Sequence, residues 1–203
     1  MYVPSQLIVW EDATATVNNI IASEGLYRLG AASGLVCYTF FLLLPLILYK
    51  LLNQVDRTQA ALMVILAVVS VPISFVSIQY KFDVLSILSG ADYLDALEPA
   101  QLQAQVMLSL ASYKNGVLVA SIFWGLWLFP FGYLVFKSGI LPKILGVFLM
   151  VGSPGYVIDS FGHSLFADYG EMGIASFITL PASIGEIGIC FWLLIMGAKN
   201  YSE

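Results

Sequence analysis

The chain has 203 residues, of which 60% are hydrophobic and only 10% are charged. An average soluble domain is about 25% charged, so this chain has too few charges to cover a water-facing surface. Intrinsic disorder is excluded too, because it requires low hydrophobicity and high net charge. The formal net charge of −5 argues against nucleic-acid binding. A polytopic membrane protein remains.

Residues 1–26 precede the first long apolar run, and we expect them to lie outside the membrane. They lack the basic region and the apolar stretch of a signal peptide. Charged residues then divide the chain into five apolar runs of about 20 residues, the length of a membrane-crossing helix. Because isolated strands leave backbone groups unpaired in lipid, the sequence predicts an all-α, five-span transmembrane bundle over residues 27–200. The predicted spans are about 28–51, 58–80, 114–137, 143–166 and 174–198.

Basic residues at the ends of the spans predict the orientation of the bundle. One side has five of them: Lys50, Arg57, Lys137, Lys143 and Lys199. The other side has three: Arg28, Lys81 and Lys114. Because cytoplasmic loops are enriched in Lys and Arg, we expect the N-terminus outside and the C-terminus in the cytoplasm.

The long outer connection, residues 81–113, has an order of its own. Its stretch Leu88 to Asp92 is typical of a turn, and Glu98-Pro99 is typical of a helix start. The third span is therefore expected to begin well outside the lipid, at Pro99.

Each predicted span contains one proline, which in mid-helix releases a backbone carbonyl and bends the helix. These residues are Pro45, Pro72, Pro130, Pro154 and Pro181. Ordinary use of proline in membrane helices explains this pattern, and a broken-helix transporter is the alternative.

Asp159 and Glu186 are the informative residues, because a carboxylate in mid-span costs about 2.5–3.5 kcal/mol and needs a partner or a role. Asp159 and His163 are four residues apart and so share a helix face. Gly152 and Gly155 lie on that face, which predicts close packing of the fourth span on the fifth with both acids directed inward.

Five polar residues are predicted to gather toward the outer side of the bundle. They are Arg28, Lys114, Asp159, His163 and Glu186. One interpretation is structural pairing, with Arg28 bonded to Asp159 and Glu186 protonated or bonded to Ser183 or a tyrosine. A second is a proton-linked or cation-binding vestibule. A third is a metal site of His163, Asp159 and Glu186, which a single histidine disfavours.

Catalytic and cofactor motifs are absent from the sequence. It has no HExxH, GxSxG, Walker loop or glycine-rich dinucleotide motif. A bis-histidine haem needs a second histidine, and a retinal Schiff base needs a mid-membrane lysine. We therefore expect no enzyme activity, no cofactor and no bound metal.

Four stretches resemble a bacterial membrane family known as domain of unknown function 4386. They are Ala22 to Gly30, Leu88 to Ala104, Leu126 to Phe161 and Leu180 to Gly197. The resemblance implies a multi-pass membrane protein of no established activity, and it covers the positions of Arg28, Asp159 and Glu186 but not that of His163. The family typically has a further hydrophobic helix before the segment matching Tyr2 to Asn19, and from the resemblance we expect this sequence to lack it.

These features predict a protein of a bacterial cytoplasmic membrane. The leading hypothesis is a structural, lipid-binding or partner-binding subunit, whose partners are the lipid bilayer and either another membrane protein or a second copy. The alternative is a proton- or cation-linked transporter or channel for a small solute that uses Asp159 and Glu186.

Overall fold

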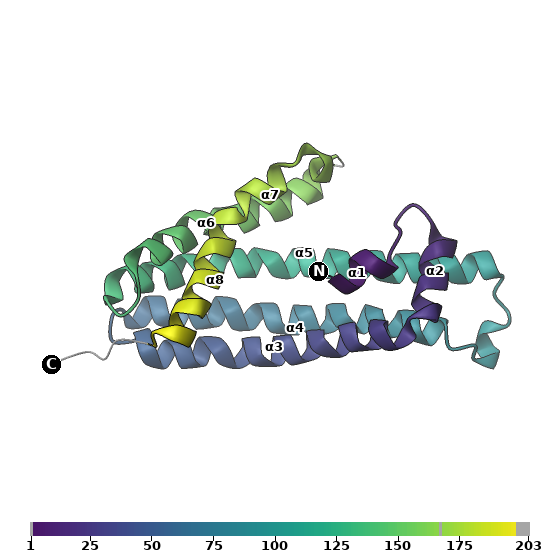
Figure 1. The fold of residues 1–203 in the computed structure, drawn as a ribbon, viewed down its shortest axis with the longest axis horizontal. Helices are drawn as coiled ribbons and strands as arrows, with labels where there is room; N and C mark the ends of the chain where they lie inside the picture. The colour runs from purple at the N-terminus through teal and green to yellow at the C-terminus, as the bar shows by residue number, and fades with distance from the viewer. Residues whose placement is uncertain (1, 167, 198–203) are drawn as a thin grey trace. The chain divides into compact units, whose positions relative to one another are not determined.

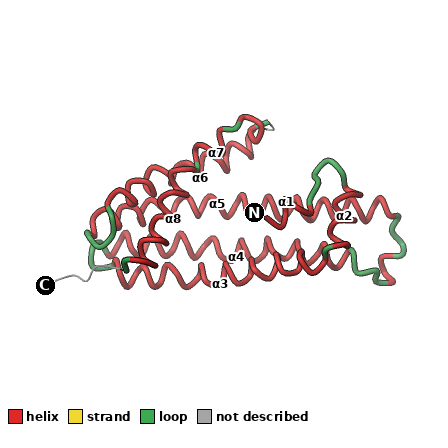
Figure 2. Tube along the Cα trace, viewed as in Figure 1, coloured by secondary structure: helices red, strands yellow, loops and turns green. Residues whose placement is uncertain are grey.

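The computed structural model describes residues 2–166 and 168–197. In these residues every regular element is a helix, which confirms the predicted all-α class (Figure 1, Figure 2). The α-helices are α1 (Tyr2–Leu7), α2 (Ala13–Ala22), α3 (Glu24–Leu52), α4 (Arg57–Ile87), α5 (Pro99–Ser138), α6 (Lys143–Leu165), α7 (Ile174–Ile178) and α8 (Leu180–Ile195). The short 3-10 helices are η1 (Asp92–Leu94) and η2 (Tyr169–Met172).

Four helices, α3 to α6, are long and apolar enough to cross a membrane. α6 agrees with the predicted span 143–166 to within one residue, and α5 begins at Pro99 as predicted. α3 begins at Glu24, inside the segment predicted to precede the membrane. α4 continues past the predicted end of the second span as far as Ile87.

The last predicted span, 174–198, is divided in two. α7 ends at Ile178, α8 begins at Leu180, and the predicted end at residue 198 lies outside the described residues. Pro181 stands in the first turn of α8, the helix position that tolerates the missing amide hydrogen of proline. Because α8 has only 16 residues, a fifth span stays a prediction.

The prolines differ from the predicted pattern at one position. Four of them lie inside membrane-length helices: Pro45, Pro72, Pro130 and Pro154. The expectation of a mid-helix proline is wrong for Pro181, because residues in a first turn have no intrahelical amide bond to lose.

The helices form two compact units. The first comprises Met1–Phe40 and Pro72–Val117, and the second comprises Phe41–Val71 and Leu118–Glu203. α3, α4 and α5 each contribute one part to each unit.

The first unit has a small apolar core between its N-terminal helices, the C-terminal part of α4 and the N-terminal part of α5. The core residues are Leu7, Val17, Ile20, Tyr27, Val84, Leu85, Val106 and Leu110. The buried Thr16 hydroxyl donates to the carbonyl of Val9 and accepts from the Val9 amide, both at 2.8 Å. Asp12 caps α2 by accepting a hydrogen bond from the Ala15 amide.

The second unit packs α6 against α5 and α8 through glycines. Gly132 and Gly146 approach so closely that a Cβ on either would meet the other's carbonyl oxygen. A Cβ on Gly152 would meet the backbone of Ala182 in α8. These contacts agree with the predicted packing of the fourth span on the fifth through small residues.

Candidate functional site

One face of α6 supplies most of the candidate site. Asp159 and Ser160 each lie three or four residues from both Tyr156 and His163, which places the four residues on neighbouring positions of one side of the helix. Gly152 and Gly155, two turns and one turn before Asp159, let α8 and α7 come close to this face. The helix period and the small residues thus bring a polar strip of α6 against the C-terminal helices.

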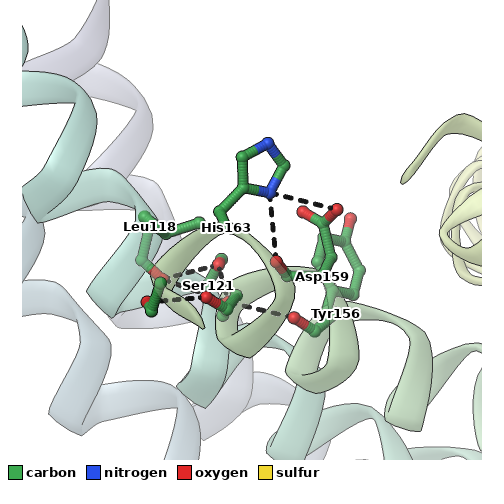
Figure 3. A network of polar contacts seen from close by, with 7 residues as sticks. Leu118, Ser121, Tyr156, Asp159 and His163 are labelled. Atoms are coloured by element: carbon green, nitrogen blue, oxygen red, sulfur yellow. Dashed lines mark hydrogen bonds and ion pairs between the residues drawn. The ribbon is translucent and has the colours of Figure 1, made fainter. Parts of the chain in front are cut away.

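Asp159 and His163 are in polar contact along α6 (Figure 3). The Nδ1 atom of His163 lies 3.5 Å from Oδ1 of Asp159 and 3.1 Å from the Asp159 carbonyl oxygen. Both neighbours are acceptors, and a hydrogen on Nδ1 is donated to the nearer one, the carbonyl oxygen. The side chains are 19% and 27% exposed, and solvent therefore reaches this pair only in part.

Glu186 reaches the same face of α6 from α8. The Tyr156 hydroxyl donates to Oε2 of Glu186 at 3.3 Å, and the glutamate is half-buried. Of the two sequence-predicted partners for Glu186, the structure selects a tyrosine, because the Ser183 hydroxyl donates to the Thr179 carbonyl at 3.3 Å. The hydrogen bond joins α6 to α8, across a separation of 30 residues in the sequence.

Two polar atoms beside these pairs are buried without a hydrogen-bond partner in the described residues: Oδ1 of Asp159 and the hydroxyl of Tyr169. The Tyr169 ring packs edge-on against His163, with centroids 4.9 Å apart, and contacts Gly162. Burial, and next the charge of Asp159, raise the pKa of the Tyr169 hydroxyl. That phenol therefore keeps its proton and can donate a hydrogen bond.

Sequence reasoning missed Tyr169, because it lies outside the predicted spans and only the fold returns it to α6. It also missed a set of serines. The Ser121 and Ser160 hydroxyls lie 2.7 Å apart, and Ser160 is also 3.2 Å from the Leu118 carbonyl oxygen (Figure 3). Ser153 donates to the Gly125 carbonyl at 2.8 Å. Buried serines at helical spacing in α5 and α6 were the available signal, and they join the two helices.

Arg28 and Lys114 belong to the first unit, and the structure gives each a neighbour there. Nε of Arg28 lies 2.6 Å from Oε1 of Glu24, and both side chains are largely exposed. Nζ of Lys114 lies 5.5 Å from the centre of the Trp10 ring. The approach of these two cations to the residues of α6 and α8 stays a prediction.

The profile of one family, described as a domain of unknown function (DUF4386), matches residues 1–197. The chain belongs to the DUF4386 family. The resemblance seen in the sequence is thereby confirmed, and the apolar helical bundle identifies a membrane protein.

A relative of this DUF4386 protein is an uncharacterized protein of Archaeoglobus fulgidus, 42% identical over 91 residues. The aligned part is 44% of this chain and 51% of the relative. The chain therefore spans about half the length of the relative that it matches. No solved structure matches the DUF4386 chain.

The structure does not support the metal interpretation. Within the described part of the DUF4386 chain, no three or more His, Cys, Asp or Glu side chains form a group that could hold a metal ion. Asp159 pairs with His163 and Glu186 pairs with Tyr156, so the three predicted ligands are divided between two contacts.

Proposed function

We propose that this DUF4386 protein is a non-enzymatic subunit of a bacterial cytoplasmic membrane, with a structural, lipid-binding or partner-binding role. In this proposal α7 and α8 together provide the fifth span, with the N-terminus outside and the C-terminus inside. The single observation that carries it is the pairing of both intramembrane acids with side chains of their own bundle.

The energetics of a carboxylate in lipid explain why that pairing indicates a structural role. A lone carboxylate in mid-span costs about 2.5–3.5 kcal/mol, and a donor on a neighbouring helix offsets part of this cost only when the helices are packed. The bond from Tyr156 to Glu186 therefore favours the assembled pair of α6 and α8 over separated helices. Glu186 thus connects α6 and α8 through a polar contact, and Asp159 has a polar partner within α6.

The helix ends support the proposed orientation. Lys50 lies in the last turn of α3 and Lys137 in the last turn of α5, while Arg57 and Lys143 begin α4 and α6. These four basic residues flank the two short connections of the second unit. By the positive-inside rule that end lies in the cytoplasm. Lys199, the fifth residue of the predicted set, lies outside the described residues.

The test compares Asp159→Asn and Glu186→Gln with two matched controls, Asp92→Asn and Glu98→Gln, whose side chains are exposed. One sample of each purified protein is titrated with denaturing detergent to measure its stability. A second, folded sample is reconstituted into vesicles that contain a pH-sensitive dye, to measure proton transport. We expect each buried substitution to lower stability by about 1 kcal/mol, each control to leave it unchanged, and no protein to move protons.

A second candidate function is a proton- or cation-linked transporter, and one specific observation favours it. Within the described residues, Oδ1 of Asp159 and the Tyr169 hydroxyl are buried without hydrogen-bond partners, and both lie beside His163. The same vesicles decide between the candidates. Solute-driven proton uptake by the wild type, lost in an Asp159→Asn variant of unchanged stability, would replace the structural proposal by this one.

A further inference from the structure

The second unit contains an apolar groove between α4, α5 and α6, with a volume of about 550 Å³. Volumes of this order are common among pockets for small ligands. Leucines of α4 and α5, prolines of α5 and α6 and a methionine of α6 form much of its wall: Leu62, Leu66, Leu126, Pro130, Pro154 and Met150. The one hydroxyl in the wall, on Ser153, donates to the Gly125 carbonyl and is already engaged.

The two prolines place polar atoms in this apolar wall. Proline has no amide hydrogen, so position 130 cannot donate to the carbonyl of Leu126, and position 154 cannot donate to that of Met150. In a helix the proline ring stands against the carbonyl four residues earlier. Each proline lines the groove together with that earlier residue, so both released carbonyls lie on the groove side of their helices.

The antiparallel packing of α5 and α6 brings the two released carbonyls together. Gly132 of α5 lies against Met150 of α6, and Gly125 lies against Tyr156 and Val157. This register places Pro130 beside Met150 and Leu126 beside Pro154. Each proline therefore stands opposite the residue whose carbonyl the other proline releases, and the two carbonyls flank one groove.

The depth of these two carbonyls in the membrane determines whether their surroundings can donate a hydrogen bond to them. Pro130 and Leu126 precede Lys137 by 7 and 11 residues, and Met150 and Pro154 follow Lys143 by the same numbers. At a rise of 1.5 Å per residue both carbonyls lie roughly 10–17 Å from the charged end of their helices. At that depth the surrounding medium is hydrocarbon, which offers an acceptor no hydrogen bond.

We propose that this groove binds one lipid-like molecule with an alkyl body and a hydroxyl group, whose hydrogen is donated to the carbonyl of Leu126 or Met150. The alkyl body matches the leucine-lined wall. The hydroxyl hydrogen carries the partial positive charge that two carbonyl oxygens in an apolar wall attract. Binding of this molecule does not depend on whether Asp159 and Glu186 are structural, so the two proposals succeed or fail separately.

The probes are a photoactivatable, diazirine-bearing hexadecanol and its methyl ether, which has the same alkyl body but no hydrogen to donate. Purified protein in lipid nanodiscs is labelled with each probe, and the modified residues are found by peptide mass spectrometry. We expect labelling at the groove residues, with the alcohol preferred about fivefold, the effect of one hydrogen bond. Equal labelling by the two probes, or labelling only elsewhere, would overturn the proposal.

Two kinds of variant distinguish the contribution of the apolar wall to probe binding from that of the two carbonyls. Leu66→Trp fills the groove and should remove labelling by both probes, whereas the control Ile47→Trp, on an exposed side chain of α3, should not. Pro130→Ala and Pro154→Ala restore the missing amides. Each should lower the preference for the alcohol, and the double variant should abolish it while ether labelling stays. An undiminished preference in the folded double variant would show that the carbonyls do not bind the hydroxyl.

If the double variant does not fold, the single proline variants and Leu66→Trp still decide. Cross-linking of the groove to a second copy of the chain, with no labelling by either probe, would contradict a lipid-like ligand and assign the groove to self-association.

Discussion

The hydroxyl of Tyr156 donates a hydrogen bond to Oε2 of Glu186, and this 3.3 Å contact joins α6 to α8. One turn further along α6, Asp159 has its polar contact with His163 of the same helix. The two acids inside the bundle therefore differ in kind. Glu186 connects two helices, whereas Asp159 is paired within one helix.

A double-mutant cycle on Tyr156 and Glu186 measures the contribution of their hydrogen bond to stability. Tyr156→Phe removes the donor, so we expect the free energy of unfolding to fall by about 1 kcal/mol in detergent titrations. In a Glu186→Gln background the same change should cost less, because the remaining acceptor is neutral. Tyr93→Phe, on an exposed tyrosine, is the control and should cost nothing. Strict additivity of the two changes would show that the contact contributes nothing to stability.

Alanine substitutions at two glycines test the packing of α8 on α6. A Cβ at Gly152 would meet the backbone nitrogen and Cα of Ala182, which cannot move as a flexible side chain can. We expect Gly152→Ala to destabilise the protein by about 1–3 kcal/mol, measured by the same unfolding titration. Gly25→Ala is the matched control, because a Cβ there meets nothing within 4 Å. Equal stabilities of the two variants would contradict the close approach of the helices.

Thr16→Val tests the two hydrogen bonds by which Thr16 of α2 holds Val9, in the connection between α1 and α2. The change removes both hydrogen bonds to Val9 and leaves the part-buried Val9 amide unpaired, while the Val9 carbonyl still accepts from the Asp12 amide, so we expect a loss of about 1–3 kcal/mol. Amide hydrogen exchange should accelerate in α1 and α2. Thr14→Val removes only an exposed contact with Gln103 and should leave exchange unchanged. Slow exchange in the Thr16 variant would show that the apolar core alone holds this segment.

Cysteine labelling tests the proposed orientation. The native cysteines, Cys37 and Cys190, are exposed and are first replaced by alanine. New cysteines are then placed at Asn53, between α3 and α4, and at Asp92 in η1. A membrane-impermeant thiol reagent added to intact cells should label position 92 only. Labelling of position 53 from outside would reverse the proposed topology.

Local sequence features determined much of this fold before any tertiary contact was considered. Lys143 and Asp168 bound the apolar run that α6 fills, and Pro99 begins α5 as its position after Glu98 predicts. Asp159 and His163 are in contact because a separation of four residues is close to one helical turn of about 3.6 residues. Each of these features depends only on the spacing of residues within one helix, and that spacing can be read from the sequence.

Only the tertiary structure decided which residues of different helices meet. The rotation and register of α6, α5 and α8 about one another gave Glu186 its tyrosine, brought Ser121 to Ser160, and returned Tyr169 from beyond the predicted span. The same packing placed Pro130 and Pro154 in the wall of one groove. Apolar runs define helices without fixing how those helices turn toward each other, and that rotation is set by the close fit of glycines against neighbouring backbones.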